Sequence, residues 1–281
     1  MSNRIVVVGS KGFIGSSLIS YLKLTGSAFL AISRDEFDLL NEKKCKEISN
    51  ILLPTDVIVF SSAVTPARSS KDVTNSMLML QNFIDSVSSL TLAGFVLISS
   101  DSVYGDFQGM VNESCPYNPN TFHGLSQVAR EIILNSSSLK SKTILRLCAV
   151  YGKGDTHNSY GPNRFVTQLI NKEPIKVFGS GLNVRDHIYI QDVVKIIGLI
   201  AQSKISGIFN VASGYTYSFR EVALACKDIF RANSIIEFVG SEGPILKKKI
   251  DVSKIQALSL DLIPCNLESG LTQWKLQEGK T

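Results

Sequence analysis

The chain has 281 residues, of which 44% are hydrophobic and 19% are charged. This apolar content is enough for a full hydrophobic core, so disorder over most of the length is excluded. The formal net charge of +5 arises from 29 Lys and Arg against 24 Asp and Glu, which are spread along the chain. A mild, scattered excess does not indicate a nucleic-acid-binding surface. No apolar run approaches the ~18 residues of a membrane-spanning helix, so neither nucleic acid nor a membrane is expected as a partner.

The first residues and the cysteines favour a cytoplasmic location. Met1 to Arg4 lead directly into the apolar segment Ile5–Val8, without the apolar region and cleavage site of a secretory signal. The five cysteines are odd in number and form no CxxC pair, which favours a reducing compartment. The three histidines show no metal-binding spacing, and no metal site is expected.

Short β-branched segments alternate with helical segments over the first half of the chain. The expected strands are Ile5–Val8, Ala28–Ser33, Asp56–Phe60, Phe95–Ser99 and Thr143–Leu147. The expected helices between them are Gly15–Leu24, Glu42–Asn50, Val73–Leu90 and Ser126–Asn135. Nearly continuous apolar strands separated by helices are typical of a parallel sheet covered on both faces. The pattern predicts an α/β fold, a doubly wound parallel-sheet Rossmann fold.

After Tyr151 the composition changes. Lys153–Arg164 is rich in Gly, Asn, Asp, Ser and Tyr and is expected to be a loop. A strand-like segment at His187–Ile190 then leads into a helix from Asp192. We therefore expect a Rossmann domain of residues 1–152 plus about 184–211. The remainder, about 153–183 plus 212–281, would form a smaller C-terminal lobe.

Three glycines lie between the first expected strand and the first helix, in Gly9-Ser10-Lys11-Gly12-Phe13-Ile14-Gly15. Glycine permits a tight turn and close approach of the backbone to a pyrophosphate, which the helix N-terminus then meets with free N–H groups. The pattern also fits an ordinary turn, but its position at this junction indicates a dinucleotide site. The residues expected to bind the cofactor are Gly9, Gly12, Phe13, Ile14 and Gly15.

The residues after the second strand distinguish NADP from NAD. An acidic side chain there would accept hydrogen bonds from the ribose of NAD, whereas this chain has Ser33-Arg34. An arginine pairs with the 2′-phosphate of NADP. The simpler alternative is a solvated arginine in a loop that also holds Asp35 and Glu36. NADP(H) is therefore favoured, with NAD(H) possible.

Several motifs in a fixed order resemble the extended short-chain dehydrogenase/reductase family, whose members act largely on nucleotide sugars. Besides the glycine turn, these motifs are Asp56–Ala63, Ile98–Gly105, Arg146–Gly152, Val177–Gly181, Arg185–Asp192 and Phe209–Gly214. Ser33–Leu40 is also similar to the NADP-using GDP-fucose synthase branch. The resemblance implies an NAD(P)-binding Rossmann domain, a smaller lobe that binds a nucleotide sugar, and a homodimer.

The resemblance also implies roles for single residues. Asp38 and Leu39 would flank the adenine, and Ala63 would line the cofactor cleft. Phe178 and Arg185 would lie at the nucleotide end of the sugar substrate. Outside this resemblance, Phe178 would be a core residue beside a turn and Arg185 the surface ion-pair partner of Asp186.

The chemistry of this family uses a Ser or Thr at the sugar hydroxyl, and a Tyr and a Lys four residues apart on one helix face. The lysine holds the nicotinamide ribose and lowers the pKa of the tyrosine, so that the phenolate can take the hydroxyl proton. Ser100 fits the first role, and the adjacent Asp101 is expected at the substrate. The Tyr and Lys align with His123 and Gln127.

This replacement leaves two hypotheses open. Gln127 can hydrogen-bond a ribose but carries no charge, while a histidine, with an ordinary pKa of about 6.5, can act as a base without a lysine. His123 equally suits a helix-start residue without chemistry. We expect an NAD(P)-dependent epimerase or reductase of a nucleotide-diphosphate sugar, with catalytic Ser100, His123 and Gln127. The alternative is a catalytically impaired dinucleotide-binding pseudoenzyme that serves as a regulatory or scaffold subunit.

Overall fold

The computed structural model describes residues 3–231, 233–241, 243–258 and 263–279. By its internal contacts the chain divides into two compact units. The first unit comprises Met1–Gly105, Glu113–Leu147 and Val194–Phe209, and the second comprises Asp106–Asn112, Cys148–Val193 and Asn210–Thr281. Residues 106–112, 148–152 and 184–193 thus belong to the second unit, although the sequence placed them in the Rossmann domain.

The first unit is built on a six-stranded sheet with the order β10-β6-β4-β3-β1-β2. These strands are β1 (Ile5–Val8), β2 (Phe29–Ile32), β3 (Val57–Phe60), β4 (Gly94–Ser100), β6 (Lys142–Leu147) and β10 (Gly207–Val211). The chain starts at β1, adds β2 on one side, and then adds β3, β4 and β6 in parallel on the other. This reversal of strand order is the defining feature of a doubly wound sheet, and it confirms the predicted fold class.

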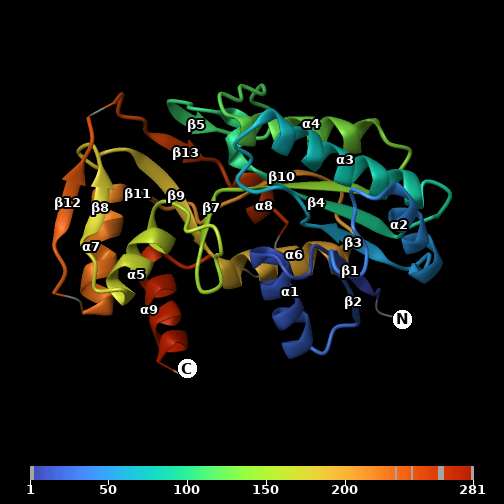
Figure 1. Cartoon of the computed structure of the whole chain (residues 1–281), viewed down its shortest axis with the longest axis horizontal. Coiled ribbons are helices and arrows are strands. Elements are labelled where there is room, and N and C mark those ends of the chain that lie inside the picture. The colour runs from blue at the N-terminus through green and yellow to red at the C-terminus, as the bar shows by residue number, and fades with distance from the viewer. Residues whose placement is uncertain (1–2, 232, 242, 259–262, 280–281) are drawn as a thin grey trace. The chain divides into compact units, whose positions relative to one another are not determined.

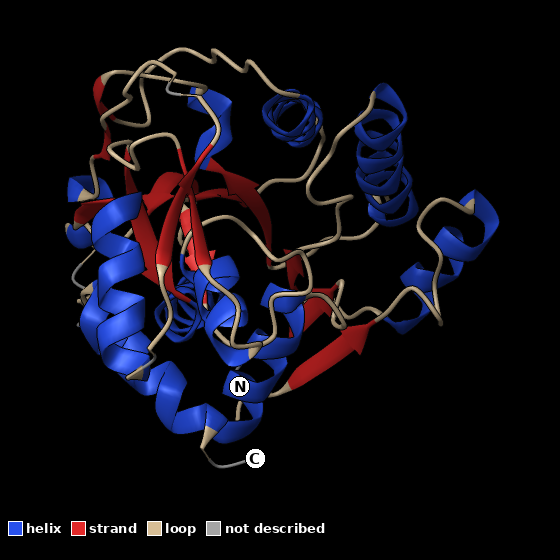
Figure 2. Cartoon of the chain, turned by 60° about the vertical axis from the view of Figure 1, so that its left-hand side comes forward, coloured by secondary structure: helices blue, strands red, loops and turns tan. Residues whose placement is uncertain are grey.

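Helices cover both faces of this sheet. In Figure 1, α3 (Ser70–Val87) and α4 (Phe122–Ser136) lie over one face, and α1 (Phe13–Leu24) and α6 (Ile190–Ser203) lie over the other. The helix expected over Glu42–Asn50 is shorter, because α2 (Glu42–Lys46) continues as a 3-10 helix, η1 (Glu47–Ile51). Figure 2 shows the strands and helices joined by loops.

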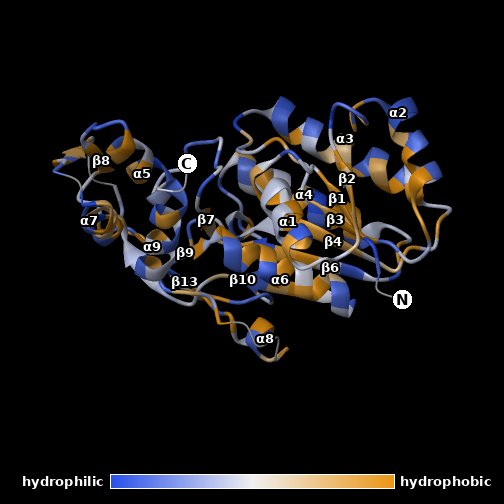
Figure 3. Cartoon of the chain, turned by 90° about the horizontal axis from the view of Figure 1, so that it is seen from below, coloured by the Kyte–Doolittle hydropathy of each residue, from blue (hydrophilic) through white to orange (hydrophobic). Residues whose placement is uncertain are grey.

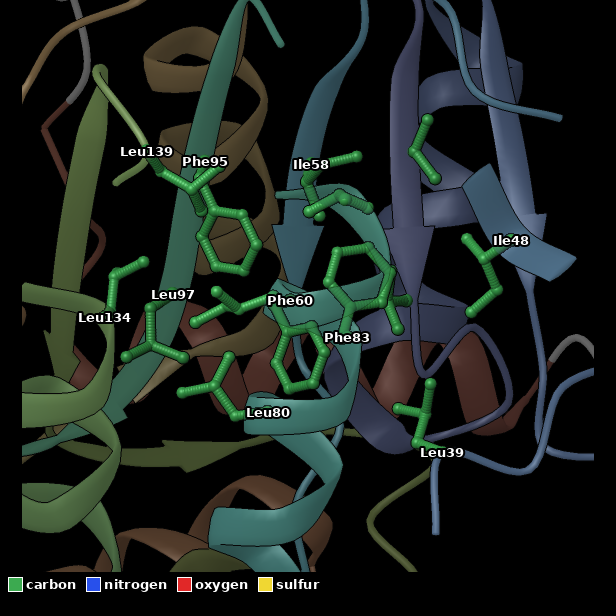
Figure 4. Packing of buried hydrophobic residues seen from close by; sticks show 14 of the residues in the cluster. Leu39, Ile48, Ile58, Phe60, Leu80, Phe83, Phe95, Leu97, Leu134 and Leu139 are labelled. Carbon is green, nitrogen blue, oxygen red and sulfur yellow. The ribbon is translucent and has the colours of Figure 1, made fainter. Parts of the chain in front are cut away.

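The core of the first unit explains why its strands were predictable. All four residues of β1 and of β3 are buried, and Figure 3 shows the hydrophobic colouring of these strands. On one face, the rings of Phe60, Phe83 and Phe95 lie with their centroids 5.3–6.0 Å apart. Figure 4 shows leucines, including Leu80 and Leu97, around these rings. Continuous burial requires the continuous apolar runs that the sequence shows.

The second unit consists of short strands paired over long sequence distances. A three-stranded sheet holds β11 (Thr216–Ser218), β9 (Val184–Tyr189) and β7 (Ala149–Tyr151). Two further pairs join β8 (Ile175–Phe178) with β12 (Ile236–Val239), and β5 (Gly109–Val111) with β13 (Lys248–Ile250). The β5–β13 and β7–β9 pairs are the physical reason why these early segments belong to this unit.

The helices of the second unit are α5 (Pro162–Ile170), α7 (Phe219–Phe230), α8 (Ser253–Gln256) and α9 (Leu267–Glu278). The loop expected over Lys153–Arg164 was wrong at its end, because Pro162 starts α5. Proline suits the first helical position, where its missing N–H would have no helical partner. None of the described helices is both long and apolar enough to cross a membrane.

Candidate functional site

The glycine turn packs so tightly that it admits only glycine at two positions. Gly9 has a φ of +90°, and a Cβ there would come within 2.9 Å of the Ser62 backbone nitrogen. A Cβ on Gly15 would collide with the carbonyl oxygen of Gly9. α1 begins at Phe13 after an N-cap, Gly12, that has no capping side chain, so the first-turn N–H groups have no partner within the helix. This cradle fits a pyrophosphate.

Charged side chains surround the end of β2. The Arg34 side chain is 80% exposed, and its Nε lies 3.9 Å from Asp38 Oδ1. Lys11, in the glycine turn, forms an exposed ion pair with Asp35. The Ser33 backbone N–H and hydroxyl both donate to the Glu36 carboxylate, at 3.1 and 2.9 Å. Two cations therefore lie near the end of β2, and each is paired with a carboxylate of the following loop.

The other residues expected at the adenine end occupy different environments. The Leu39 side chain is 5% exposed and belongs to the hydrophobic core, while its carbonyl oxygen accepts from Asn82 Nδ2 at 2.8 Å. Asp38 is partly exposed and also accepts from the Leu40 N–H. Ala63 directly follows Ser62, the residue on which the Gly9 turn packs. The structure thus brings the glycine turn beside the segment that holds Ala63.

Ser100 ends β4 at the carboxyl edge of the sheet. Its Oγ accepts from the Ser102 N–H at 3.1 Å and so caps the 3-10 helix η2 (Asp101–Tyr104). The same hydroxyl lies 3.4 Å from Asp101 Oδ1. Ligands of open parallel sheets bind outside the carboxyl ends of the strands, and Ser100 occupies this position.

Helix α4 carries the two unusual residues of the predicted catalytic centre. It begins earlier than expected, at Phe122, because the Thr121 hydroxyl accepts from the Gly124 N–H at 3.0 Å and caps the helix. His123 is therefore in the first turn, and Gln127 follows one turn later on the same face. The Gln127 side chain is buried.

A residue that the sequence did not single out, Arg130, lies against Gln127. Arg130 Nη1 donates to Gln127 Oε1 at 2.6 Å and to the Ile98 carbonyl at 3.2 Å, and Nη2 donates to the Ser62 carbonyl at 3.1 Å. Arg130 is 1% exposed. Burial lowers the pKa of its guanidinium to about 10, so it keeps its charge at neutral pH. The signal in the sequence is a basic residue three positions after Gln127, on the same helix face.

A second buried arginine forms a separate cluster nearby in the sequence. Arg146 Nη2 lies 2.7 Å from Glu131 Oε2, with the two side chains 2% and 0% exposed. The Tyr117 hydroxyl donates to the same carboxylate at 2.9 Å. Burial, together with the negative charge of Glu131, raises the pKa of Tyr117. Tyr117 is therefore held in a structural cluster and is not poised to act as a base.

The structure places one of the two substrate residues expected in the second unit at an exposed position and the other at a partly buried one. Phe178 is 51% exposed, and the Arg164 guanidinium carbon lies 5.7 Å from its ring centroid. Arg185 Nη2 lies 3.4 Å from Asp106 Oδ1. The simpler interpretations were wrong in both cases: Phe178 is not in the core, and Arg185 pairs with Asp106. Asp186 instead points inward and accepts from the Ser213 and Gly214 N–H groups at 2.9 and 2.8 Å.

Comparison with known families agrees with this arrangement. A family model described as the NAD dependent epimerase/dehydratase family matches residues 5–212. The chain belongs to this family. An uncharacterized UDP-glucose epimerase of Bacillus subtilis, YtcB, is 26% identical over 304 residues, which cover 96% of each chain. A dTDP-D-glucose 4,6-dehydratase of Dictyostelium discoideum is 25% identical over 78% of this chain, which spans 60% of that longer protein.

The fold is also that of solved epimerases. A UDP-glucuronic acid 4-epimerase from Bacillus cereus, in complex with UDP-glucuronic acid and NAD, superposes with a TM-score of 0.83 at 23% identity. The match covers 98% of this chain and 99% of that one. As a member of the epimerase/dehydratase family the chain belongs to a family of enzymes. Its His123 and Gln127 are the features for which the family resemblance offers no role.

Proposed function

We propose that this epimerase/dehydratase family member is an NAD(P)-dependent epimerase or reductase of nucleotide-diphosphate sugars. The observation that carries the proposal is that the tight Gly9 turn packs on Ser62 while Arg130 bonds both Ser62 and Gln127. One hydrogen-bonded edge of the sheet thereby joins the pyrophosphate cradle to the helix of the expected catalytic centre.

The residues at this edge of the sheet would have separate roles in catalysis and in cofactor binding. The Ser100 hydroxyl would hydrogen-bond the reacting hydroxyl of the sugar, and His123 would accept its proton and later return it. Gln127 would hold the nicotinamide ribose. A nicotinamide dinucleotide, when bound, supplies hydride transfer. That the B. cereus relative was solved with NAD supports a cofactor of this class.

The second unit supplies groups that suit the nucleotide part of the substrate. The exposed Phe178 ring offers a face for a base, and Arg185 a guanidinium for a diphosphate. Asp106 would release Arg185 on binding, since an exposed ion pair contributes only about 0–1 kcal/mol. The relatives named for UDP-sugars support this class of substrate. Homodimerisation and a cytoplasmic location remain predictions.

One observation favours a second candidate function, a dinucleotide-binding pseudoenzyme. Gln127 is uncharged, and Tyr117, the nearest tyrosine before α4, is bonded to Glu131. Neither a phenol nor a lysine is therefore available in the expected places. Both candidates predict dinucleotide binding, and only the enzyme predicts turnover.

The test is turnover of a panel of UDP-, dTDP- and GDP-sugars with NADH, NADPH and their oxidised forms, followed by NMR of the sugar and by cofactor absorbance. The enzyme predicts an isomer or a reduced sugar, with at least tenfold loss in Ser100→Ala and His123→Phe. Ser20→Ala, at an exposed position in the second half of α1, is a matched control. Dinucleotide binding without turnover on any sugar would favour the pseudoenzyme, and full activity of His123→Phe would contradict its role.

A second experiment addresses the choice of cofactor. We propose that Arg34 favours NADPH, because its side chain is 80% exposed and a guanidinium pairs well with a phosphate. Arg34→Ala is expected to weaken the binding of NADPH several-fold and to leave the binding of NADH unchanged, as measured by fluorescence titration. Equal affinities of the unmodified protein for the two dinucleotides would contradict the preference.

A further inference from the structure

Arg130 is a buried cation that forms no ion pair with a described residue, although the charge of the neighbouring Glu131 attracts it. Its partners are the carbonyl oxygens of Ser62 and Ile98 and the amide oxygen of Gln127, and it forms no ion pair with any described carboxylate. The buried Nε has no hydrogen-bond partner within the described residues. Enclosing a cation among neutral partners is unfavourable, because the charge loses its hydration. A chain that needed only packing here would be more stable with an apolar side chain.

The bond to Arg130 fixes the orientation of the Gln127 amide. A guanidinium can only donate hydrogen bonds, so the atom that faces it at 2.6 Å is the carbonyl oxygen, Oε1. The amide nitrogen, Nε2, is thereby turned away from Arg130 and donates to no described residue. A carbonyl that accepts from a cation makes its amide group a stronger donor. Gln127 is thus prepared as a donor with a positive charge directly behind it.

We propose that Arg130 acts as a positioning residue that, through Gln127, supplies the donor and the positive charge that a lysine at position 127 supplies in the resembling family. The inference rests on the proposed function, since it assigns Gln127 to the ribose of a nicotinamide dinucleotide. The glutamine at position 127 and the arginine at position 130 are linked in this proposal. The cation that the family carries at position 127 lies here at position 130, one turn along the same helix face. Arg130 touches no reacting atom in this account.

A purely structural role for Arg130 makes different predictions. Its bonds to Ser62 and Ile98 tie α4 to the ends of β3 and β4, so a strap of this kind would affect stability and every ligand alike. The proposed role affects only ligands that contain the nicotinamide ribose. It also makes Gln127→Lys harmful while Arg130 is present, because two cations would then meet in a buried site.

The experiment measures dissociation constants of NADH, NADPH and ADP by isothermal titration calorimetry. It uses the unmodified protein, Arg130→Met, Gln127→Lys, and Gln127→Lys combined with Arg130→Ala. ADP contains the pyrophosphate but lacks the nicotinamide ribose, so it is the internal control. Arg130→Met is expected to weaken the dinucleotides about tenfold, the effect of one charge-assisted hydrogen bond, and to leave ADP within twofold. Gln127→Lys is expected to weaken dinucleotide binding by a similar factor. The double variant is expected to restore the dissociation constants to within about threefold of those of the unmodified protein.

Several results would overturn the proposal. If Arg130→Met binds the dinucleotides with unchanged affinity, or loses as much affinity for ADP as for the dinucleotides, the role of Arg130 is structural only. A double variant that binds no better than Gln127→Lys alone would show that the charge cannot be moved between the two positions, and this comparison stands even if Arg130→Met does not fold. Failure of the proposed function is distinguishable, because then the unmodified protein itself binds neither dinucleotide.

Discussion

The two buried arginines of the first unit differ in what surrounds their charge. Arg146 has a bidentate carboxylate partner in Glu131, and Tyr104 accepts a further bond from it at 2.9 Å. Burial opposes the charge of Arg146, but the bonds and the attraction of Glu131 outweigh burial and raise its pKa. The hydrogen-bond partners of Arg130 are all neutral, and burial lowers its pKa more than the attraction of Glu131 raises it.

This difference distinguishes an arginine that stabilises the fold from one that serves ligand binding. A buried cation whose carboxylate is present is part of the folded structure, since removing it strands the opposite charge. A buried cation that no carboxylate contacts directly is costly in the ligand-free protein, and such departures from good packing are expected at functional sites. Arg146 therefore holds α4 against β6, whereas Arg130 prepares α4 for a ligand.

The largest effect is expected for Arg146→Met. The substitution leaves Glu131, which is 0% exposed, without its counter-charge, and we expect a loss of about 3–5 kcal/mol in the free energy of unfolding. Urea denaturation followed by circular dichroism measures this loss. Tyr117→Phe is the matched control, because it removes one hydrogen bond to Glu131 and should cost only about 1 kcal/mol. Equal losses in the two variants would show that the ion pair is not the stabilising element.

How much of this could be predicted from the sequence depended on the range of the interactions. β1 and β3 were found at once, because their burial on both faces demands continuous apolar runs. The glycine turn was found for a similar reason, since only glycine fits Gly9 and Gly15. The pairing of β5 with β13 could not be found, because strands of three residues carry almost no periodicity and the partners are over a hundred residues apart.

The candidate site was predictable only in part for the same reason. The spacing of His123 and Gln127 is local and was visible, and the Thr121 cap that starts α4 at Phe122 was also available in the sequence. The burial of Arg130 depends on carbonyl groups of two distant strands. A basic residue on a helix is ordinarily exposed, so nothing local marked this one as buried.

A moderate effect on stability is expected at Asp186, a buried acidic residue of the second unit that, like Arg130, forms no ion pair with a described residue. Asp186 is 3% exposed, and among the residues that the structure describes it accepts from Ser213, Gly214 and Cys148. Asp186→Asn places an amide among these donors and should cost about 1–3 kcal/mol at acidic pH, where the carboxyl is protonated. Urea unfolding of the unmodified protein and of Asp186→Asn measures the difference in their free energies of unfolding.

The pH dependence of that difference gives a second test. Burial raises the pKa of the Asp186 carboxyl above its ordinary 3.8, so the folded chain binds this proton more tightly than the unfolded chain does. The stability from this group is therefore fully present below pH 3.8 and is lost as the pH rises through the raised value. The stability advantage of the unmodified protein over Asp186→Asn should shrink as the pH rises through this range. An advantage that grows with pH would contradict the assignment.

The smallest effect is expected at the start of α4. Thr121→Ala removes the side chain that caps the Gly124 N–H and should cost about 1 kcal/mol. Because His123 lies in that first turn, turnover should fall more than dinucleotide affinity does. Thr121→Ser keeps a capping hydroxyl and should restore both quantities, as steady-state kinetics and unfolding curves would show.

The contrast between the two arginines is tested most directly by the urea unfolding midpoint of Arg130→Met, measured without and with saturating NADH. Replacing a buried cation that forms no ion pair by an apolar side chain of similar length is expected to be close to neutral for stability, and a ligand stabilises a protein according to its affinity. We expect a ligand-free midpoint near that of the unmodified protein and a reduced shift with NADH. A midpoint that falls as far as that of Arg146→Met, with the full NADH shift retained, would contradict it.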